Sequence, residues 1–101
     1  MALVEISVVP VGTATTSLGD YIADAIGVLE TAGVKYEVSA MGTMFEGATK
    51  DVFSLARRMH EEAFKLGAQR VITTITIDDR RDKEVTMKSK VAAVKKRLKK
   101  S

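Results

Sequence analysis

The fold is decided by the stretch VKYEVSAMGTMFEG, residues 34–47. Its first half, residues 34–40, alternates apolar and polar side chains, as a half-buried β-strand does. Gly42 permits a tight turn, and residues 43–47 return as a second strand. The stretch therefore predicts a β-hairpin near the middle of the chain.

A strand and a helix are expected before this hairpin. Residues 3–11 alternate in the same way and predict a strand that Pro10 ends or places at an edge. Residues 18–32 carry apolar side chains at helical spacing, after Ser17 as a capping residue and before Gly33 as a stop.

The same order is repeated after the hairpin. Thr49 is expected to cap a second helix that Gly67 closes, and residues 69–77 form a strand rich in β-branched residues. Asp82 is expected to cap a third helix, whose apolar residues Met87, Val91, Val94 and Leu98 fall on one stripe.

The predicted order is βαββαβ followed by a C-terminal helix, which is an α+β fold of the ferredoxin-like sandwich type. Residues 1–98 form one domain that includes this last helix, and residues 99–101 form a basic tail. Right-handed crossovers place the first two helices on one face of the sheet and leave the other face uncovered.

The uncovered face is expected to carry a mixture of apolar, acidic and hydroxyl side chains: Leu3, Glu5, Ser7, Val9, Glu37, Ser39, Thr74 and Thr76. This mixture is too apolar for open water and too polar for a core, so a partner sheet or a ligand should cover it. A homo-oligomer, a tetramer in particular, is the expectation.

Charge is divided unevenly along the 101 residues, whose net charge is +3. Up to residue 87 there are nine Lys or Arg against thirteen Asp or Glu, and after it seven Lys or Arg and no acid. The basic character therefore belongs to the C-terminal end, and an acidic body favours a cationic ligand.

The absence of cysteine removes disulfides, thiol catalysis and thiolate metal sites. It also agrees with a reducing cytoplasm. No apolar run approaches membrane-spanning length and no leader pattern opens the chain. We expect a cytoplasmic protein without membrane contact, metal, cofactor or catalytic residue.

Two acids stand in apolar strands, Glu5 and Glu46. A carboxylate on a half-buried sheet needs a partner, because uncompensated burial is costly. The partner is either a Lys or Arg across the sheet or between subunits, or a ring nitrogen or cationic group of a ligand. Thr13 and Ser17 precede a helix N-terminus that can bind an anion, although they also suit a polar loop and a cap.

Arg80 and Arg81 could hold an anion or a neighbouring subunit's carboxylate, and a turn of mutually paired charges is the equal alternative. Asp78 and Asp79 are adjacent on a strand and point to opposite faces, so joint catalysis is not expected. His60, the only histidine, is expected to pack beside Phe53 and Phe64.

Several of these segments together resemble the thiamine-binding family, formerly uncharacterised, of small stand-alone ferredoxin-like proteins related to the YkoF binders. The resemblance covers almost the whole chain and is carried by residues 9–13, 16–18, 34–39, 41–43, Glu46 and 70–81. It implies a non-enzymatic protein that assembles as a dimer of dimers and binds thiamine or its hydroxymethylpyrimidine moiety.

An aminopyrimidine needs acceptors and donors at its ring nitrogens and amino group, and an apolar platform beneath it. On this resemblance the residue types that meet these needs are Glu5, Thr13, Ser17, Ser39, Met41, Gly42, Thr43, Phe45, Glu46 and Thr74. Glu46 is the acid expected to recognise the ligand, because small residues beside it leave room for a ring.

A regulatory or structural assembly domain of the ACT type, binding an anion or no small molecule, is the alternative. RNA binding fits poorly, because the uncovered face lacks the aromatic side chains on which bases stack.

Overall fold

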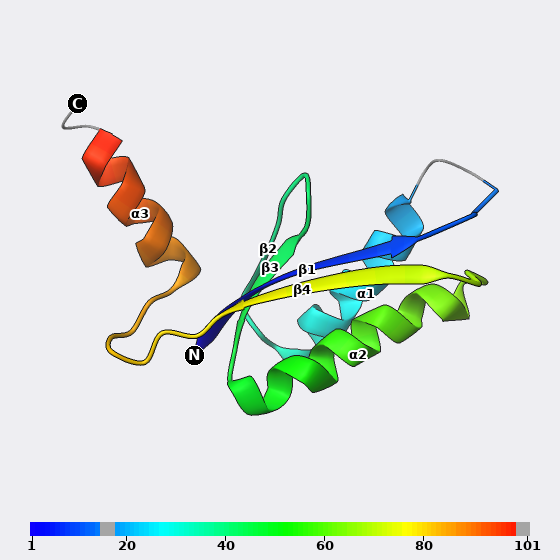
Figure 1. Cartoon of the computed structure of the whole chain (residues 1–101), viewed down its shortest axis with the longest axis horizontal. Helices are drawn as coiled ribbons and strands as arrows, with labels where there is room; N and C mark the ends of the chain where they lie inside the picture. Colours follow the sequence, from blue (N-terminus) through cyan, green and yellow to red (C-terminus); the bar gives the residue numbers. More distant parts are fainter. Residues whose placement is uncertain (15–17, 99–101) are drawn as a thin grey trace.

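The computed structural model describes residues 1–14 and 18–98, and these form a four-stranded antiparallel sheet with two helices against one face and a third helix apart (Figure 1). The strands are β1 (Ala2–Pro10), β2 (Tyr36–Val38), β3 (Thr43–Gly47) and β4 (Val71–Asp78). The helices are α1 (Gly19–Ala32), α2 (Thr49–Lys65) and α3 (Met87–Leu98). The element order and the sheet order β2-β3-β1-β4 are those of the predicted ferredoxin-like sandwich.

The core lies between the sheet and the helix pair α1 and α2. From the sheet it receives Val4, Ile6 and Phe45, and from the helices it receives Leu29 and Met59, all at most 2% exposed. These residues occupy one face of each strand and one stripe of each helix, so the period-2 and period-3.6 patterns of the sequence meet in a single core.

Two helix ends follow the predicted glycines. Gly33 has a φ of 73° and its N–H donates to the Glu30 carbonyl, while Gly67 has a φ of 99° and donates to Phe64. These left-handed conformations carry no penalty for glycine, which explains why α1 and α2 stop there.

The predicted start of α3 is wrong. Asp82 lies in the turn before the helix and binds Arg80, and α3 begins only at Met87. Thr86 and Ser89 cap it reciprocally, since each backbone N–H donates to the other residue's hydroxyl at 2.9 and 3.0 Å. The arrangement is that of a capping box with Ser89 where Glu or Gln is usual, so its sequence pattern is not the usual one. The expected Ser17 cap of α1 lies outside the described residues.

The second face of the sheet carries no helix layer over most of its area. Strand pairing places Leu3, Glu5, Ser7 and Val9 on this side of β1, opposite Met44 and Glu46 of β3 and opposite Ile72, Thr74, Thr76 and Asp78 of β4. We call this surface, with Glu37 of β2, the open face. Ser39, which was expected there, lies beyond β2 in the hairpin loop.

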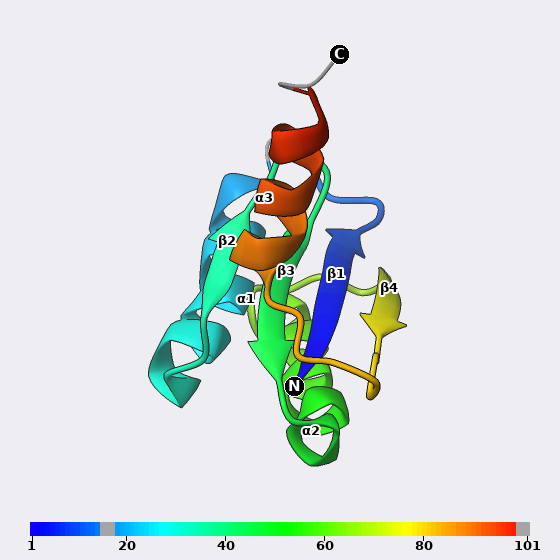
Figure 2. The same ribbon diagram turned by 90° about the vertical axis from the view of Figure 1, so that its left-hand side faces the viewer.

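Helix α3 touches the open face only at its first turn and then leads away from the sheet (Figure 1). Met87 is 8% exposed, whereas Val91 and Val94 farther along are 49% and 54% exposed. Seen from the end where α3 lies, the four strands stand side by side behind the helix (Figure 2).

Among the described residues, no helix has both the length and the apolar character needed to cross a membrane.

Candidate functional site

A cavity of about 290 Å³ opens where the β2–β3 hairpin separates from β1. We call it the hairpin pocket. Its walls are mostly apolar and its polar groups are hydroxyls and backbone, and it is lined by Ile6, Ser7, Val8, Val9, Leu18, Ile22, Ala25, Val38, Ser39, Ala40, Met41, Gly42, Thr43 and Met59.

The pocket exists because β1 is longer than its partner β3. The two strands pair only from Ala2 to Ile6, whereas β1 continues to Pro10 with β4 as its single partner in the described structure. Beyond Ile6 the edge of β1 that faces the hairpin is therefore unpaired. An open strand edge presents alternating N–H and C=O groups to whatever occupies the space beside it.

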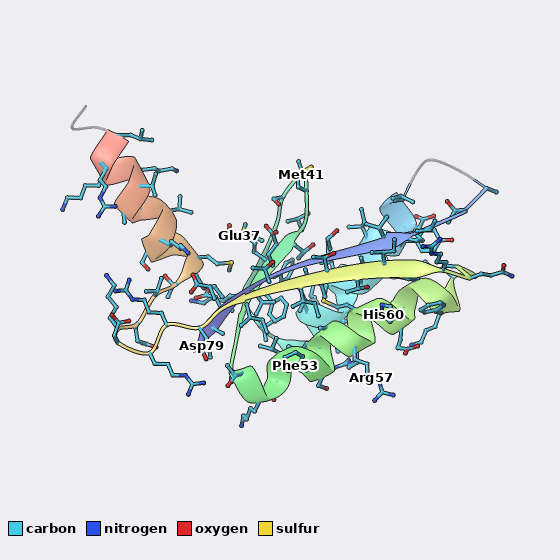
Figure 3. The ribbon with its side chains drawn as sticks, in the orientation of Figure 1. Glu37, Met41, Phe53, Arg57, His60 and Asp79 are labelled. Carbon is cyan, nitrogen blue, oxygen red and sulfur yellow. The ribbon has the colours of Figure 1, made fainter. Side chains whose placement is uncertain are left out.

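The loop of the hairpin is held in place by its own backbone. The Ser39 N–H and hydroxyl both donate to the Gly42 carbonyl, at 2.9 and 2.7 Å. Met41 stands at the tip, 87% exposed (Figure 3). Thr43 begins β3 directly after the loop and is only 6% exposed. The pocket thus has a fixed hydroxyl-bearing side and an exposed apolar side chain at its rim.

Gly42 forms the boundary between this pocket and the open face. A Cβ atom placed on it would lie 3.3 Å from the Ile6 carbonyl oxygen and 3.4 Å from Cγ of Glu5. The missing side chain therefore lets the Glu5 side chain lie directly beside the pocket wall. Glu5 itself is exposed.

Glu5 also lines a second cavity, of about 260 Å³, between the open face and the first turns of α3. We call it the acidic hollow. Leu3, Met44, Met87 and Val91 give it apolar walls. Among the described residues that line it, the charged side chains are the carboxylates of Glu5, Glu37 and Asp78 and the ammonium group of Lys90. Lys90 donates to Asp78 at 2.7 Å.

Glu46 is not part of the hairpin pocket. Its side chain belongs to the open face, opposite Leu3, and is 8% exposed beneath the start of α3. In the described part of the chain no hydrogen-bond or ion-pair partner reaches its carboxylate, although Lys35 and Lys88 line the same recess. Its carboxylate is nevertheless not sealed from solvent, because no fully buried side-chain oxygen or nitrogen in the described part of the chain lacks a hydrogen-bond partner.

The remaining predicted site residues are distributed around the fold. Phe45 is fully buried in the core and so offers no surface to a ligand. Thr74 lies on the open face opposite Ser7. Thr13 is half-buried beyond the end of β1 and is absent from the hairpin-pocket lining, and Ser17 lies outside the described residues.

Arg80 and Arg81 are engaged by neighbouring carboxylates. Arg80 makes a two-point contact with Asp82 at 2.6 and 2.8 Å, and Arg81 binds Asp79 at 2.8 Å. The hydrogen bond from Arg81 lowers the pKa of Asp79 below its ordinary value of 3.8. The turn of mutually paired charges is thus what forms in this chain, and the pairing weighs against an anion site.

His60 lies between α2 and β4, as a packing role requires. Its Nδ1 atom is 2.6 Å from the Thr73 hydroxyl, and its ring meets Phe64 edge to face at 5.3 Å. With Phe53 and Arg57, it belongs to the side of the molecule away from the hairpin tip (Figure 3).

Sequence reasoning missed the apolar wall of the hairpin pocket. Leu18, Ile22 and Met59 were recognised only as members of helical stripes. The one available signal was the length difference between the alternating segments 3–11 and 43–47, which leaves half of the longer strand without a partner.

The fold and the pocket together define a small α+β protein of the ferredoxin-like class with a cavity beside its central strand. The model of the family described as thiamine-binding protein matches residues 4–95, and the chain belongs to this family. It is 40% identical to the UPF0045 protein YqgV of Bacillus subtilis, over 97% of this chain and 98% of that one. It is 39% identical to a UPF0045 protein of Methanothermobacter thermautotrophicus, over 97% and 100%.

Solved structures show the same fold. Protein MJ1052 of Methanocaldococcus jannaschii superposes with a TM-score of 0.85 at 31% identity, covering 92% of this chain and 94% of that one. A Thermotoga maritima protein, TM0486, provisionally assigned to thiamine biosynthesis or salvage, superposes with a TM-score of 0.77 at 26% identity, covering 92% and 97%.

Proposed function

We propose that this protein binds thiamine or its hydroxymethylpyrimidine moiety in the hairpin pocket, as a cytoplasmic homo-oligomer and without catalysing a reaction. The observation that carries the proposal is the convergence of Ser39, Met41, Gly42 and Thr43 on the unpaired edge of β1. Membership of the thiamine-binding family and the provisional assignment of TM0486 support the choice of ligand.

The chemistry of the pocket suits an aminopyrimidine. Such a ring carries an amino donor beside a ring-nitrogen acceptor, and an open strand edge offers the complementary C=O and N–H groups. The hydroxyls of Ser39 and Thr43 add polar contacts, while Ile22, Val38 and Met59 contribute the apolar surface that the faces of a ring require.

Thiamine brings a positive thiazolium ring in addition, and the Glu5 carboxylate lies beside Gly42, which lines the pocket. Its Cδ atom lies 3.6 Å from the position that a Gly42 Cβ would take. A carboxylate at the rim stabilises a cation there, so thiamine should bind more tightly than the neutral pyrimidine alone.

A binding role is supported by the way the reactive groups are used. The single histidine is held by Thr73 and Phe64 on the α2 side, and the chain has no cysteine. The alternative, an assembly domain that binds an anion at Arg80 or Arg81, has less support because both guanidinium groups are paired.

Calorimetric titration of the purified protein with thiamine, its phosphates and hydroxymethylpyrimidine tests the proposal. Ile22→Trp narrows the pocket from the exposed side of α1 and should weaken binding by about tenfold or more. Phe53→Trp, an exposed position on α2, is the matched control and should bind as the wild type does. Absence of heat with every ligand, or equal affinity of both variants, would overturn the proposed site.

A further inference from the structure

The free edge of β1 presents its backbone groups to the hairpin pocket in a fixed order. The N–H of Val11 donates to the carbonyl of Arg70, directly before β4, at 2.8 Å. Successive residues of a strand point their N–H and C=O groups to opposite neighbours. The odd-numbered residues of β1 therefore bond to β4, and the even-numbered residues point toward the hairpin.

A second contact shows the same order from the hairpin side. The Ile6 carbonyl oxygen lies 3.3 Å from the position that a Gly42 Cβ would take, so this oxygen points at the hairpin. Ile6 is also the last residue of β1 that pairs with β3, opposite Thr43. Because Gly42 has no side chain, none covers the Ile6 carbonyl oxygen at the pocket that both residues line.

Beyond Ile6, Val8 carries the single backbone donor that β1 directs at the hairpin. No described residue of the hairpin pairs with Val8, because the hairpin tip leads away from β1 (Figure 1). Pro10, the next residue on the same side, has no N–H, and proline is tolerated where its nitrogen faces no partner strand. The edge thus offers the Ile6 carbonyl, the Val8 N–H and the Val8 carbonyl, in this order.

The direction of the Val8 side chain leaves room for a flat ring beside its backbone. This side chain packs against the core, so the N–H and C=O groups of Val8 lie in the plane of the sheet. A ring that bonds to them lies in that plane also. One face of the ring then meets Ile22, Ala25 and Met59, which line the pocket from the two helices.

We infer that the backbone of Ile6 and Val8 selects the ligand of the hairpin pocket, and that the group it selects is a ring nitrogen next to an amino group. The ring nitrogen accepts from the Val8 N–H, and the amino group donates to the Ile6 carbonyl oxygen. The inference rests on the proposed function and names the edge of the pyrimidine that is recognised. Val8 is then a specificity-determining residue through its backbone.

The same order decides which way thiamine enters. With its amino group at Ile6, the pyrimidine directs its neighbouring substituent, which carries the thiazolium, toward Gly42 and Glu5. A 4-oxo analogue has a carbonyl in place of the amino group and a hydrogen on the ring nitrogen, so it would set N–H against N–H and C=O against C=O. It can bond to this edge only with its ring turned over, which directs the thiazolium toward Pro10 and away from Glu5.

Titration of the wild-type protein with thiamine and with its 4-oxo analogue is the first test. The dissociation constant of the analogue should be higher by about tenfold or more, because its mismatched polar groups leave donors and acceptors of the site unpaired. Equal affinity for the two ligands would overturn the inference.

Replacing the amide bond before Val8 by an ester is the second test, because it removes the N–H and keeps the side chain. Val8 does not donate to β4, so no N–H of that ladder is lost. Affinity for thiamine should fall by about tenfold or more, and the preference for thiamine over the analogue should shrink. Val8→Pro removes the same N–H in recombinant protein, and Pro10 shows that β1 accepts a proline on this side.

An ester before Ile75 is the matched control. Ile75 lies opposite Ile6, whose backbone groups point to the hairpin, so the Ile75 N–H points away from β1 to the free edge of β4. The control thus loses an edge N–H on the other side of the sheet. It should bind thiamine as the wild type does.

The inference and the proposed function fail in different ways. If no thiamine-related ligand binds to the wild type, the proposed function fails and the inference fails with it. If thiamine binds and the Val8 ester binds it as tightly as the Ile75 ester does, only the inference is overturned. Circular dichroism confirms the folding of each variant, and the comparison of the two ligands needs no variant.

Discussion

At the scale of single residues, the neighbourhood of Gly42 decides what the site can hold. Any side chain at this position would press against the Ile6 carbonyl and the Glu5 side chain. Its absence joins a pocket of hydroxyl and apolar groups to a carboxylate on the other side of the sheet. The chemistry of the site thus depends on a position that contributes no side chain to it.

Removing one hydroxyl tests the polar side of the pocket. Thr43→Val keeps the shape of a 6% exposed side chain, and loss of the hydrogen bond that we propose to the ligand should weaken hydroxymethylpyrimidine binding by about 1 kcal/mol. Titration calorimetry measures the effect. Thr74→Val on the open face is the control, and a similar loss in that variant would contradict the assigned pocket.

The two strand acids should respond differently to the same substitution. Glu5→Gln removes the charge beside the pocket and should weaken thiamine binding by about 1.5–3 kcal/mol, the range for hydrogen bonds to charged groups. Glu46→Gln should leave the affinity for thiamine unchanged, because this side chain lies on the open face and does not line the hairpin pocket.

Affinity and unfolding of both variants are measured on the same preparations. If Glu46→Gln rather than Glu5→Gln weakened binding, the ligand would lie on the open face beneath α3, and Glu46 would be the recognising acid, as the family resemblance led us to expect.

At the scale of elements, the turn between β4 and α3 is organised by local ion pairs. Arg81 binds Asp79 and Arg80 binds Asp82, two residues apart in each case. These contacts are exposed, so they fix the shape of the turn more than they stabilise the fold. Helix α3 then begins with the Thr86–Ser89 cap.

The pKa of Asp79 should return toward 3.8 in Arg81→Gln, because the hydrogen bond from Arg81 is the main cause of its lowering. A carboxyl whose pKa is lowered by folding contributes stability above its ordinary pKa, and this is lost as the pH falls through the folded value. A pH titration monitored by NMR measures the pKa values of the Asp79 and Asp82 carboxyl groups. Asp82 is the internal control, since its pKa is lowered by Arg80 and should remain unchanged.

The last residues of the chain should be dispensable for the ligand. Truncation after Leu98 removes residues 99–101 and leaves the whole hairpin pocket in place. Affinity for thiamine should therefore equal that of the full chain in calorimetry. A large loss of affinity would indicate that the basic tail takes part in ligand binding.

At the scale of the whole molecule, the described residues leave most of one sheet face without a helix layer, and α3 reaches that face through Met87 and Lys90. The layer of α1 and α2 buries one side of the sheet, and only the first turn of α3 reaches the other. A chain of 101 residues buries a modest fraction of its surface on folding, so association should supply part of its stability.

Thermal stability should consequently depend on protein concentration. If the folded state is an oligomer, the melting temperature rises with concentration, because dissociation accompanies unfolding. Calorimetric scans over a hundredfold range of concentration check this point. A melting temperature independent of concentration would contradict an obligate oligomer.

The sequence by itself determined the order of the elements and the two faces of the sheet. Alternation in residues 34–47 and helical spacing on both sides of them are local properties, and strand alternation decides which side chains share a face. The family resemblance added Ser39, Met41, Gly42, Thr43 and Glu5 as residue types that suit an aminopyrimidine.

The tertiary structure alone decided which of these groups meet. Alternation predicts that Phe45 and Glu46 lie on opposite faces, but only packing shows that Phe45 is enclosed by α1 and α2 and that Glu46 lies outside the hairpin pocket. Likewise, the pocket arises because β1 extends beyond the end of β3. This extension is visible only once the two strands, some forty residues apart in the sequence, are paired. Which strands pair, and over what length they pair, is decided by packing of the whole chain and not by a local sequence pattern.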